Sequence, residues 1–271
     1  MEKLIVLGTG NAMATRCYNT CFALQNGDEY FLVDGGGGNG ILGRTLEAGI
    51  PYEKIRHAFL THSHTDHIFG MVWILRKISM LIGQDKYHGT FNFYCHTELL
   101  RKIMTIIELT MPHNMTRHFG KRIQLHSVAD GETRTIMEHD ITFFDIRSTK
   151  EKQFAFSILL HNNRKLTFLG DEPFRESSEQ YAKNSQWLLS EAFCLYSQRD
   201  IFNPYAKHHS TVREACEAAE RLAVQHLVLW HTEDSAIESR KQRYAAEGSQ
   251  YFTGKLLIPD DLDVIPLQNE K

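Results

Sequence analysis

Cysteine and proline are scarce in this sequence, and long apolar runs are missing. The 271 residues include five cysteines, six prolines and no CxxC pair. This odd and scattered set argues against a disulfide framework or a zinc ribbon, and it favours a reducing compartment. No signal region precedes the apolar stretch "KLIVLGTG", and no run approaches the roughly 18 residues of a membrane helix. We therefore expect a cytoplasmic protein with no membrane partner.

A strong charge of one sign is missing as well. The formal net charge is -3, and 42% of the residues are hydrophobic, as is ordinary for a globular core. This charge gives no overall attraction to nucleic acid, so a polyanion would need a local patch. The "GGGG" of Gly35 to Gly38 lacks the Lys and Ser/Thr of a phosphate-binding loop. We interpret it as a tight strand exit.

Short β-rich runs alternate with stretches of helical periodicity, which predicts sheet layers covered by helices. Thr211 or Ser210 is a suitable N-cap for the last of these stretches, with Glu214 in its first turns. No linker or repeat interrupts the pattern, so we predict a single domain over residues 1–271. The helical stretches are Gly40 to Ala48, Ile68 to Ile82, Thr97 to Met111 and Thr211 to Val224.

The stretch "THSHTDH", Thr61 to His67, follows the apolar run "HAFL" and is rich in metal-ligand residues. His62 and His64 share one side of an extended chain, because side chains alternate there. Asp66 and His67 follow in the turn toward a helix and can face a second ion. Zinc accepts both imidazole nitrogen and carboxylate oxygen, and hydrolytic sites often hold two ions. The alternative is a cluster of surface histidines.

Two further residues of ligand type end predicted strands. Asp171 ends "KLTFLGD", and His231 ends "HLVLWH". Strand ends are where loops converge and sites are usually built. An aspartate there can bridge two ions, although either residue taken alone is also compatible with a plain surface position.

With these residues assembled, the sequence resembles the metallo-β-lactamase superfamily, whose signature is HxHxDH, a distant His, a bridging Asp and a last His. It is most similar to ribonuclease Z, over nearly the whole chain. "LLSEAF" is similar to the His-Glu-Ala-Thr motif and places Glu191 on its glutamate, and "HHSTVREACEAAERLAVQHLVLWHT" places His209 on the histidine paired with it. The resemblance implies an α/β fold, an αββα sandwich of two mixed sheets flanked by helices, with two metals at its edge.

The resemblance also implies a reaction, namely hydrolysis of a phosphodiester, with RNA as one candidate. Such a reaction needs divalent ions, zinc or manganese, a carboxylate that orients a water, and a proton donor for the leaving alkoxide. Asp66 is a candidate for both ligand and base, and His209, oriented by Glu191, for the acid. The alternative for the last two is a surface ion pair. A homodimer is expected by analogy with the family.

The sequence departs from the family where a metal-binding His should follow the strand "ITFFDI". Arg147 or Ser148 stands there, and no His lies between Asp140 and Leu160. An arginine offers only donors and cannot ligate a cation, so the first metal site is expected to be weak or empty. One replacement ligand is a histidine of "MPHNMTRHFGKRIQLH", which otherwise reads as a solvated basic loop; the candidates are His113, His118 and His126. Arg147 can instead bind the substrate phosphate.

The long Gly- and Pro-rich arm of tRNA-processing relatives is also missing, since only a few residues separate "RSTK" from "FAFSILL". This weakens the case for precursor tRNA. Two alternatives therefore stay open. One is a hydrolase of a small substrate such as a cyclic nucleotide, a thioester or a lactone, and the other is a non-catalytic module with a degenerate metal site.

Overall fold

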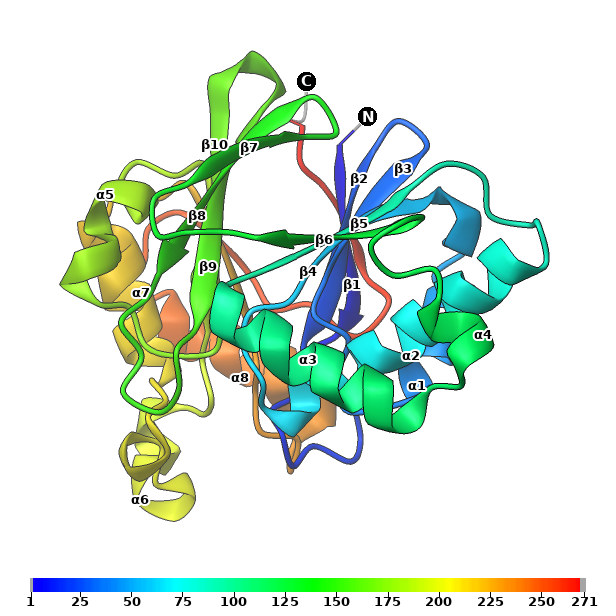
Figure 1. Cartoon of the computed structure of the whole chain (residues 1–271). Coiled ribbons are helices and arrows are strands. Elements are labelled where there is room, and N and C mark those ends of the chain that lie inside the picture. Colours follow the sequence, from blue (N-terminus) through cyan, green and yellow to red (C-terminus); the bar gives the residue numbers. More distant parts are fainter. Residues whose placement is uncertain (1, 269–271) are drawn as a thin grey trace. The chain divides into compact units, whose positions relative to one another are not determined.

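The computed structural model describes residues 2–268 and divides into two compact units (Figure 1). The first unit comprises Met1–Gly8, Tyr18–Ala129 and Asp261–Lys271, and the second comprises Thr9–Cys17 and Asp130–Asp260. Each unit is built on one seven-stranded sheet. The predicted class, two mixed sheets flanked by helices, is confirmed, whereas the single domain over 1–271 stays a prediction. No helix within residues 2–268 is long and apolar enough to cross a membrane.

The sheet of the first unit has the strand order β14-β1-β2-β3-β4-β5-β6. The pairs from β14 to β3 are antiparallel, and those from β3 to β6 are parallel. The carboxyl ends of β3, β4 and β5 therefore meet at one edge, which is where α/β folds usually bind ligands. The strands are β1 Lys3–Gly8, β2 Cys21–Asn26, β3 Glu29–Val33, β4 Ile55–Phe59, β5 Phe91–Cys95, β6 Ile123–Ser127 and β14 Val264–Pro266.

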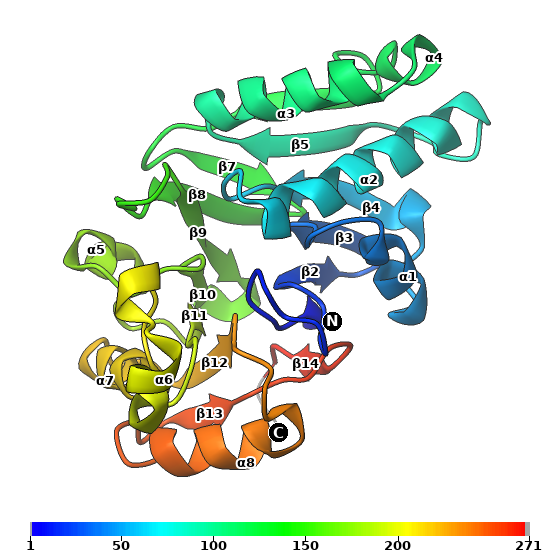
Figure 2. The ribbon, with the colours of Figure 1, turned by 90° about the horizontal axis from the view of Figure 1, so that it is seen from below.

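The helices of the first unit bury apolar faces in one core with the strands. Ile74, Ile78 and Ile103 are fully buried in this core, and α2 and α3 run along the strands in Figure 2. The three predicted helical stretches in this unit are confirmed, and α2 begins three residues earlier than predicted, at Thr65 instead of Ile68. The elements are α1 Gly40–Glu47, a 3₁₀ turn at Tyr52–Lys54, α2 Thr65–Gly83, α3 Thr97–Thr110 and α4 His113–Thr116.

The glycine run after β3 seats α2 against the sheet. The amide of Gly35 donates to the carbonyl of His67 (3.0 Å), and the amide of Gly70 donates to Gly36 (2.8 Å). A Cβ on Gly70 would lie 1.7 Å from the Gly35 carbonyl oxygen, and Gly36 has φ +71°. Only glycine allows so close an approach. The predicted tight strand exit is confirmed, and it also fixes the first turn of α2.

The sheet of the second unit has the order β13-β12-β11-β10-β9-β8-β7. Its strands are antiparallel from β7 to β10 and parallel from β10 to β13. The parallel half again brings several carboxyl ends to one edge. The strands are β7 Thr133–Ile136, β8 His139–Asp145, β9 Phe154–Leu160, β10 Arg164–Phe168, β11 Trp187–Glu191, β12 His226–Trp230 and β13 Lys255–Leu257.

The helices of the second unit include the predicted stretch at Thr211, which is α7. Thr211 is its N-cap, and the Thr211 amide donates to the Glu214 carboxylate (2.8 Å) in a capping box. Val212 and Cys216 on α7 pack into the core beside Leu227 of β12. The helices are α5 Glu179–Ala182, α6 Arg199–Phe202, α7 Val212–Arg221 and α8 Ile237–Gly248, with 3₁₀ turns at His161–Asn163, Glu176–Ser178, Tyr196–Gln198 and Tyr205–Lys207.

Candidate metal centre

In the first unit the residues of "THSHTDH" form a compact cluster between β4 and α2. His64 is the N-cap of α2, so Asp66 and His67 occupy its first turn. The Nε2 atom of His62 lies 2.8 Å from Nδ1 of His64, and the rings of His62 and His67 are 4.2 Å apart between centroids. Of these four residues only His64 is partly exposed. Their ring nitrogens converge, as the ligands of a divalent metal do.

Asp34 holds this cluster in place from the end of β3. Its carboxylate accepts hydrogen bonds from the amide of Thr61 (2.9 Å) and from its hydroxyl, and Oδ2 lies 2.7 Å from Nδ1 of His67. A carboxylate on one ring nitrogen fixes the tautomer and orients the other nitrogen, as second-shell carboxylates do in metal sites. That other nitrogen, Nε2 of His67, lies 3.2 Å from Oδ2 of Asp66.

The electrostatics of His67 favour a cation. Burial opposes the charged ring, but the carboxylates of Asp66 and Asp34 outweigh it and hold the pKa of His67 well above its usual value. The two carboxylates thus favour a positive charge at this ring, which a proton supplies and which a bound divalent ion would supply in its place. The residues of the first unit therefore fit a divalent ion in their chemistry.

In the second unit the parallel strands deliver three predicted residues to one edge. Glu191 ends β11 and lies beside Trp230, the last residue of the neighbouring strand β12. His231 follows directly after that strand. Asp171 follows β10, and its Oδ2 lies 3.7 Å from Nε2 of His231. Asp171, Glu191 and His231 are all buried. The interpretation of Asp171 or His231 as a plain surface residue is wrong.

Glu191 and His209 form a buried pair beside His231. Nδ1 of His209 lies 3.5 Å from Oε2 of Glu191, and the Ser210 amide donates to Oε1 of Glu191 (2.6 Å). The His209 ring stacks on Phe193, with 5.1 Å between centroids. Ligand-type atoms of Glu191, His209 and His231 all lie within 4.8 Å of one another. A surface ion pair is excluded, because Glu191 is fully buried.

The segment after β8 contains no histidine. Arg147 and Ser148 stand where the metal-binding histidine was expected. Arg147 has φ +60° and a side chain that is 60% exposed, and its guanidinium lies 2.6 Å from Asp130 and 3.5 Å from Asp145. Ser148 donates to the carboxylate of Glu172. Arg147 thus has two carboxylate partners, and its role in substrate binding stays a prediction.

The histidine-rich segment supplies no replacement ligand within residues 2–268. His113 opens the short α4 and is exposed, and His126 lies on β6 with Nε2 3.0 Å from the side-chain oxygen of Asn92. Neither these two residues nor His118 belongs to any group of described residues that can hold a metal. The segment is not simply a loop, since it forms α4 and β6.

Asp34 is the residue of this cluster that the sequence analysis did not single out. It follows β3 and precedes the glycine run. An acidic residue at a strand end before glycines is a usable signal for a residue that supports a site. Its partners lie 27 and 33 positions further along the chain, so local spacing does not reveal them.

Solved structures of the metallo-β-lactamase fold match the chain over its length. The protein YhfI from Bacillus subtilis covers 97% of this chain and 98% of its own, with 19% identity and a TM-score of 0.79. The short form of human tRNase Z covers 98% and 100%, with 21% identity and a TM-score of 0.74. Ribonuclease Z from Thermococcus sibiricus is 28% identical over 98% of this chain and 97% of its own length.

The chain thus has the fold of the metallo-β-lactamase proteins, and its sequence is similar to that of ribonuclease Z over nearly its whole length. The resemblance seen in the sequence is confirmed. Within this class, the family model of the anti-Pycsar protein Apyc1 matches residues 2–251, and the chain belongs to that family.

Proposed function

We propose that this protein is a phosphodiesterase that uses a metal-activated water. The observation that carries the proposal is the buried Glu191 and His209 pair beside the ligand-type His231. A phosphate ester with an alkoxide leaving group needs a proton donor, whereas the thiolate of a thioester leaves without one. The pair therefore favours phosphodiesters over thioesters among the substrates of the superfamily.

Six of these residues are proposed as ligands of two divalent ions. His62, His64 and Asp171 would hold the first ion, and Asp66, His67 and His231 the second, with Asp171 bridging them. The nitrogen-rich ligand set favours zinc over magnesium or calcium, and manganese is the other candidate. The first ion lacks the family's third histidine, so it would be the weaker one.

When bound, the metal ions would neutralise the charge of the phosphodiester and supply an activated water. Asp66, whose carboxylate lies in the first turn of α2 beside His67, would be the acceptor for a proton of that water. Oε2 of Glu191 lies 3.5 Å from Nδ1 of His209, so Nε2 is the ring nitrogen that we propose donates a proton to the leaving oxygen. Arg147 is proposed to contact the substrate phosphate.

The test is hydrolysis of a generic phosphodiester, bis(p-nitrophenyl) phosphate, in the presence of zinc or manganese. The wild-type protein is expected to cleave it, and His64→Ala to abolish cleavage, because that variant removes a ligand of the first ion. His88→Ala, at an exposed histidine in the first unit, is the matched control and should keep full activity. Absence of cleavage by the folded wild type with either metal would contradict the proposal.

RNA is the first candidate substrate, because curated relatives are named ribonuclease Z. A second candidate is a small phosphodiester such as a cyclic nucleotide. It is favoured by the short connection between β8 and β9, which is Ile146–Gln153 and leaves no room for a long arm. Comparing the hydrolysis of precursor tRNA with that of cyclic nucleotides at equal protein concentration separates the two.

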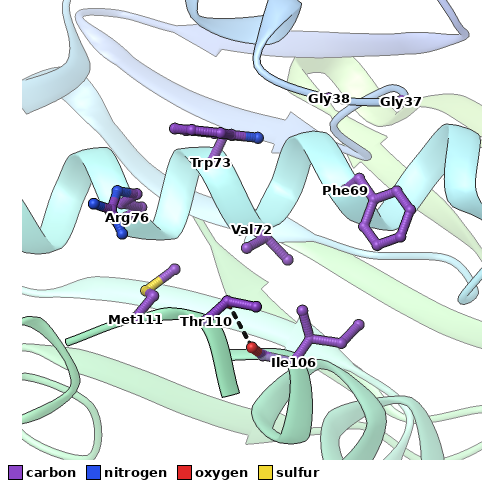
Figure 3. Close-up of a pocket in the computed structure, with 9 residues that line it drawn as sticks. All are labelled: Gly37, Gly38, Phe69, Val72, Trp73, Arg76, Ile106, Thr110 and Met111. Carbon is purple, nitrogen blue, oxygen red and sulfur yellow. Dashed lines mark hydrogen bonds between the residues drawn. The ribbon is translucent and has the colours of Figure 1, made fainter. Parts of the chain in front are cut away.

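A homodimer in the cytoplasm is proposed for the biological state of the molecule. A groove of about 370 Å³ in the first unit, between α2 and α3, supports a second copy as partner (Figure 3). Phe69 and Trp73 on α2 are 42% and 39% exposed and line the same groove, and contiguous apolar surface marks interaction sites more often than scattered apolar residues do. Ile106, on α3, and Met111, at its end, line the same groove.

A further inference from the structure

The connection Ile146–Gln153 in the second unit, which lacks the family's histidine, is a well-anchored loop. The Ser148 hydroxyl accepts hydrogen bonds from the amides of Lys150 (3.1 Å) and Glu151 (3.2 Å) and donates to Glu172. The hydroxyl of Thr149 lies 3.0 Å from Nδ1 of His208. The loop is thus tied to the residue after Asp171 and to the residue before His209.

This anchoring places a cation beside the proposed bridging ligand. Nζ of Lys150 lies 3.9 Å from Oδ2 of Asp171 and 3.9 Å from Oε1 of Glu172. The Lys150 side chain is only 18% exposed, and both carboxylates are buried. Glu172 also has Arg175, at 3.2 Å, and Ser148 as partners. The charge of Lys150 is therefore available to compensate that of Asp171.

We infer that Lys150 takes over the charge of the weaker metal ion, so that the protein binds one divalent ion tightly and a second ion only weakly. The inference rests on the proposed metal centre. A lysine ammonium has three donors and no acceptor, so it cannot ligate a metal. It can only compete with a metal for the Asp171 carboxylate and repel an ion that approaches it.

The test is calorimetric titration of metal-stripped full-length protein with Zn²⁺, together with elemental analysis after desalting. The wild type is expected to retain one equivalent and to bind the second weakly. Lys150→Met should tighten the second binding step by about tenfold or more, because a like charge near the ion is removed. Lys152→Met is the matched control, since this exposed lysine two positions on carries the same charge, and it should behave as the wild type does.

Lys150→Gln is measured beside Lys150→Met, with circular dichroism on each, so that a folding defect in one variant does not decide the result. Two equally tight equivalents in the wild type, unchanged in both Lys150 variants, would overturn the inference and leave the proposed function intact. No bound zinc in any folded protein would overturn both.

Discussion

At the scale of single residues, the proposed chemistry is carried by buried polar groups whose partners are defined. Oδ2 of Asp34 lies 2.7 Å from Nδ1 of His67, and Oε2 of Glu191 lies 3.5 Å from Nδ1 of His209. The first contact fixes which ring nitrogen of His67 faces the site, and the second places a carboxylate beside the His209 ring. One imidazole is then suited to bind a metal and the other to donate a proton.

The proton-donor role of His209 predicts a split between two substrates. His209→Ala should slow cleavage of a dinucleotide, whose leaving group is an alkoxide, by about 10²–10⁴-fold, the usual contribution of general acid catalysis. The same variant should change the rate with bis(p-nitrophenyl) phosphate little, because p-nitrophenolate leaves without a proton. The rates of the variant and of the wild type on both substrates, measured with one preparation of each, show whether the two losses differ. An equal loss on both would assign His209 a structural or ligand role instead.

The sequence was sufficient to predict ligand-type residues, because their chemistry is visible in their types and in the HxHxDH spacing. His62, Asp171 and Glu191 are buried at strand ends, as expected. Asp34 and Lys150 could not be found in this way. Their roles arise from contacts made by folding, such as that of Lys150 with Asp171, 21 positions further along the chain.

At the scale of the elements, the position of α2 depends on backbone contacts rather than on side-chain packing alone. Gly35 and Gly70 approach so closely that either Cβ would overlap the other backbone. The first turn of this helix contains Asp66 and His67. The close contact between the two glycines thus fixes the position of α2, and with it the positions of Asp66 and His67.

Gly70→Ala is expected to lower the free energy of unfolding by about 1–3 kcal/mol, because the added methyl group overlaps the Gly35 carbonyl and the backbone must shift. Gly43→Ala in α1 is the control, since a Cβ there meets nothing within 4 Å and alanine is the better helix former. It should leave stability unchanged or raise it. Urea denaturation of the two variants measures both effects. Equal stability of Gly70→Ala and the wild type would show that the contact is not tight.

Element prediction was best where apolar periodicity was strong and weakest where a helix is polar. The stretches that became α1 and α3 were predicted to within one residue, and that of α7 to within three. The helix α8 was missed, because its buried anchor is a charged residue. Arg240 donates to the hydroxyls of Thr9 (3.0 Å) and Thr232 (2.9 Å) and to the carbonyl of Pro259 (2.8 Å). Such long-range partners make an arginine a core residue, and no local pattern signals them.

At the scale of the whole molecule, the two units repeat one design. Each sheet has an antiparallel half and a parallel half, and each parallel half ends in ligand-type side chains. This architecture was implied by the family resemblance and not by periodicity, since alternation within a strand does not determine the order of strands in a sheet. The family membership rests on a match over residues 2–251.

The proposed metal-dependent phosphodiesterase activity is tested by removing the metal and adding it back. Protein stripped by a chelator and desalted is assayed with bis(p-nitrophenyl) phosphate while zinc or manganese is added back, and circular dichroism confirms that the fold is kept. The stripped protein is expected to cleave nothing, and the rate should rise with added metal until it saturates. A rate that is unchanged by stripping, or that stays at zero at every metal concentration, would show that the protein is not a metal-dependent phosphodiesterase.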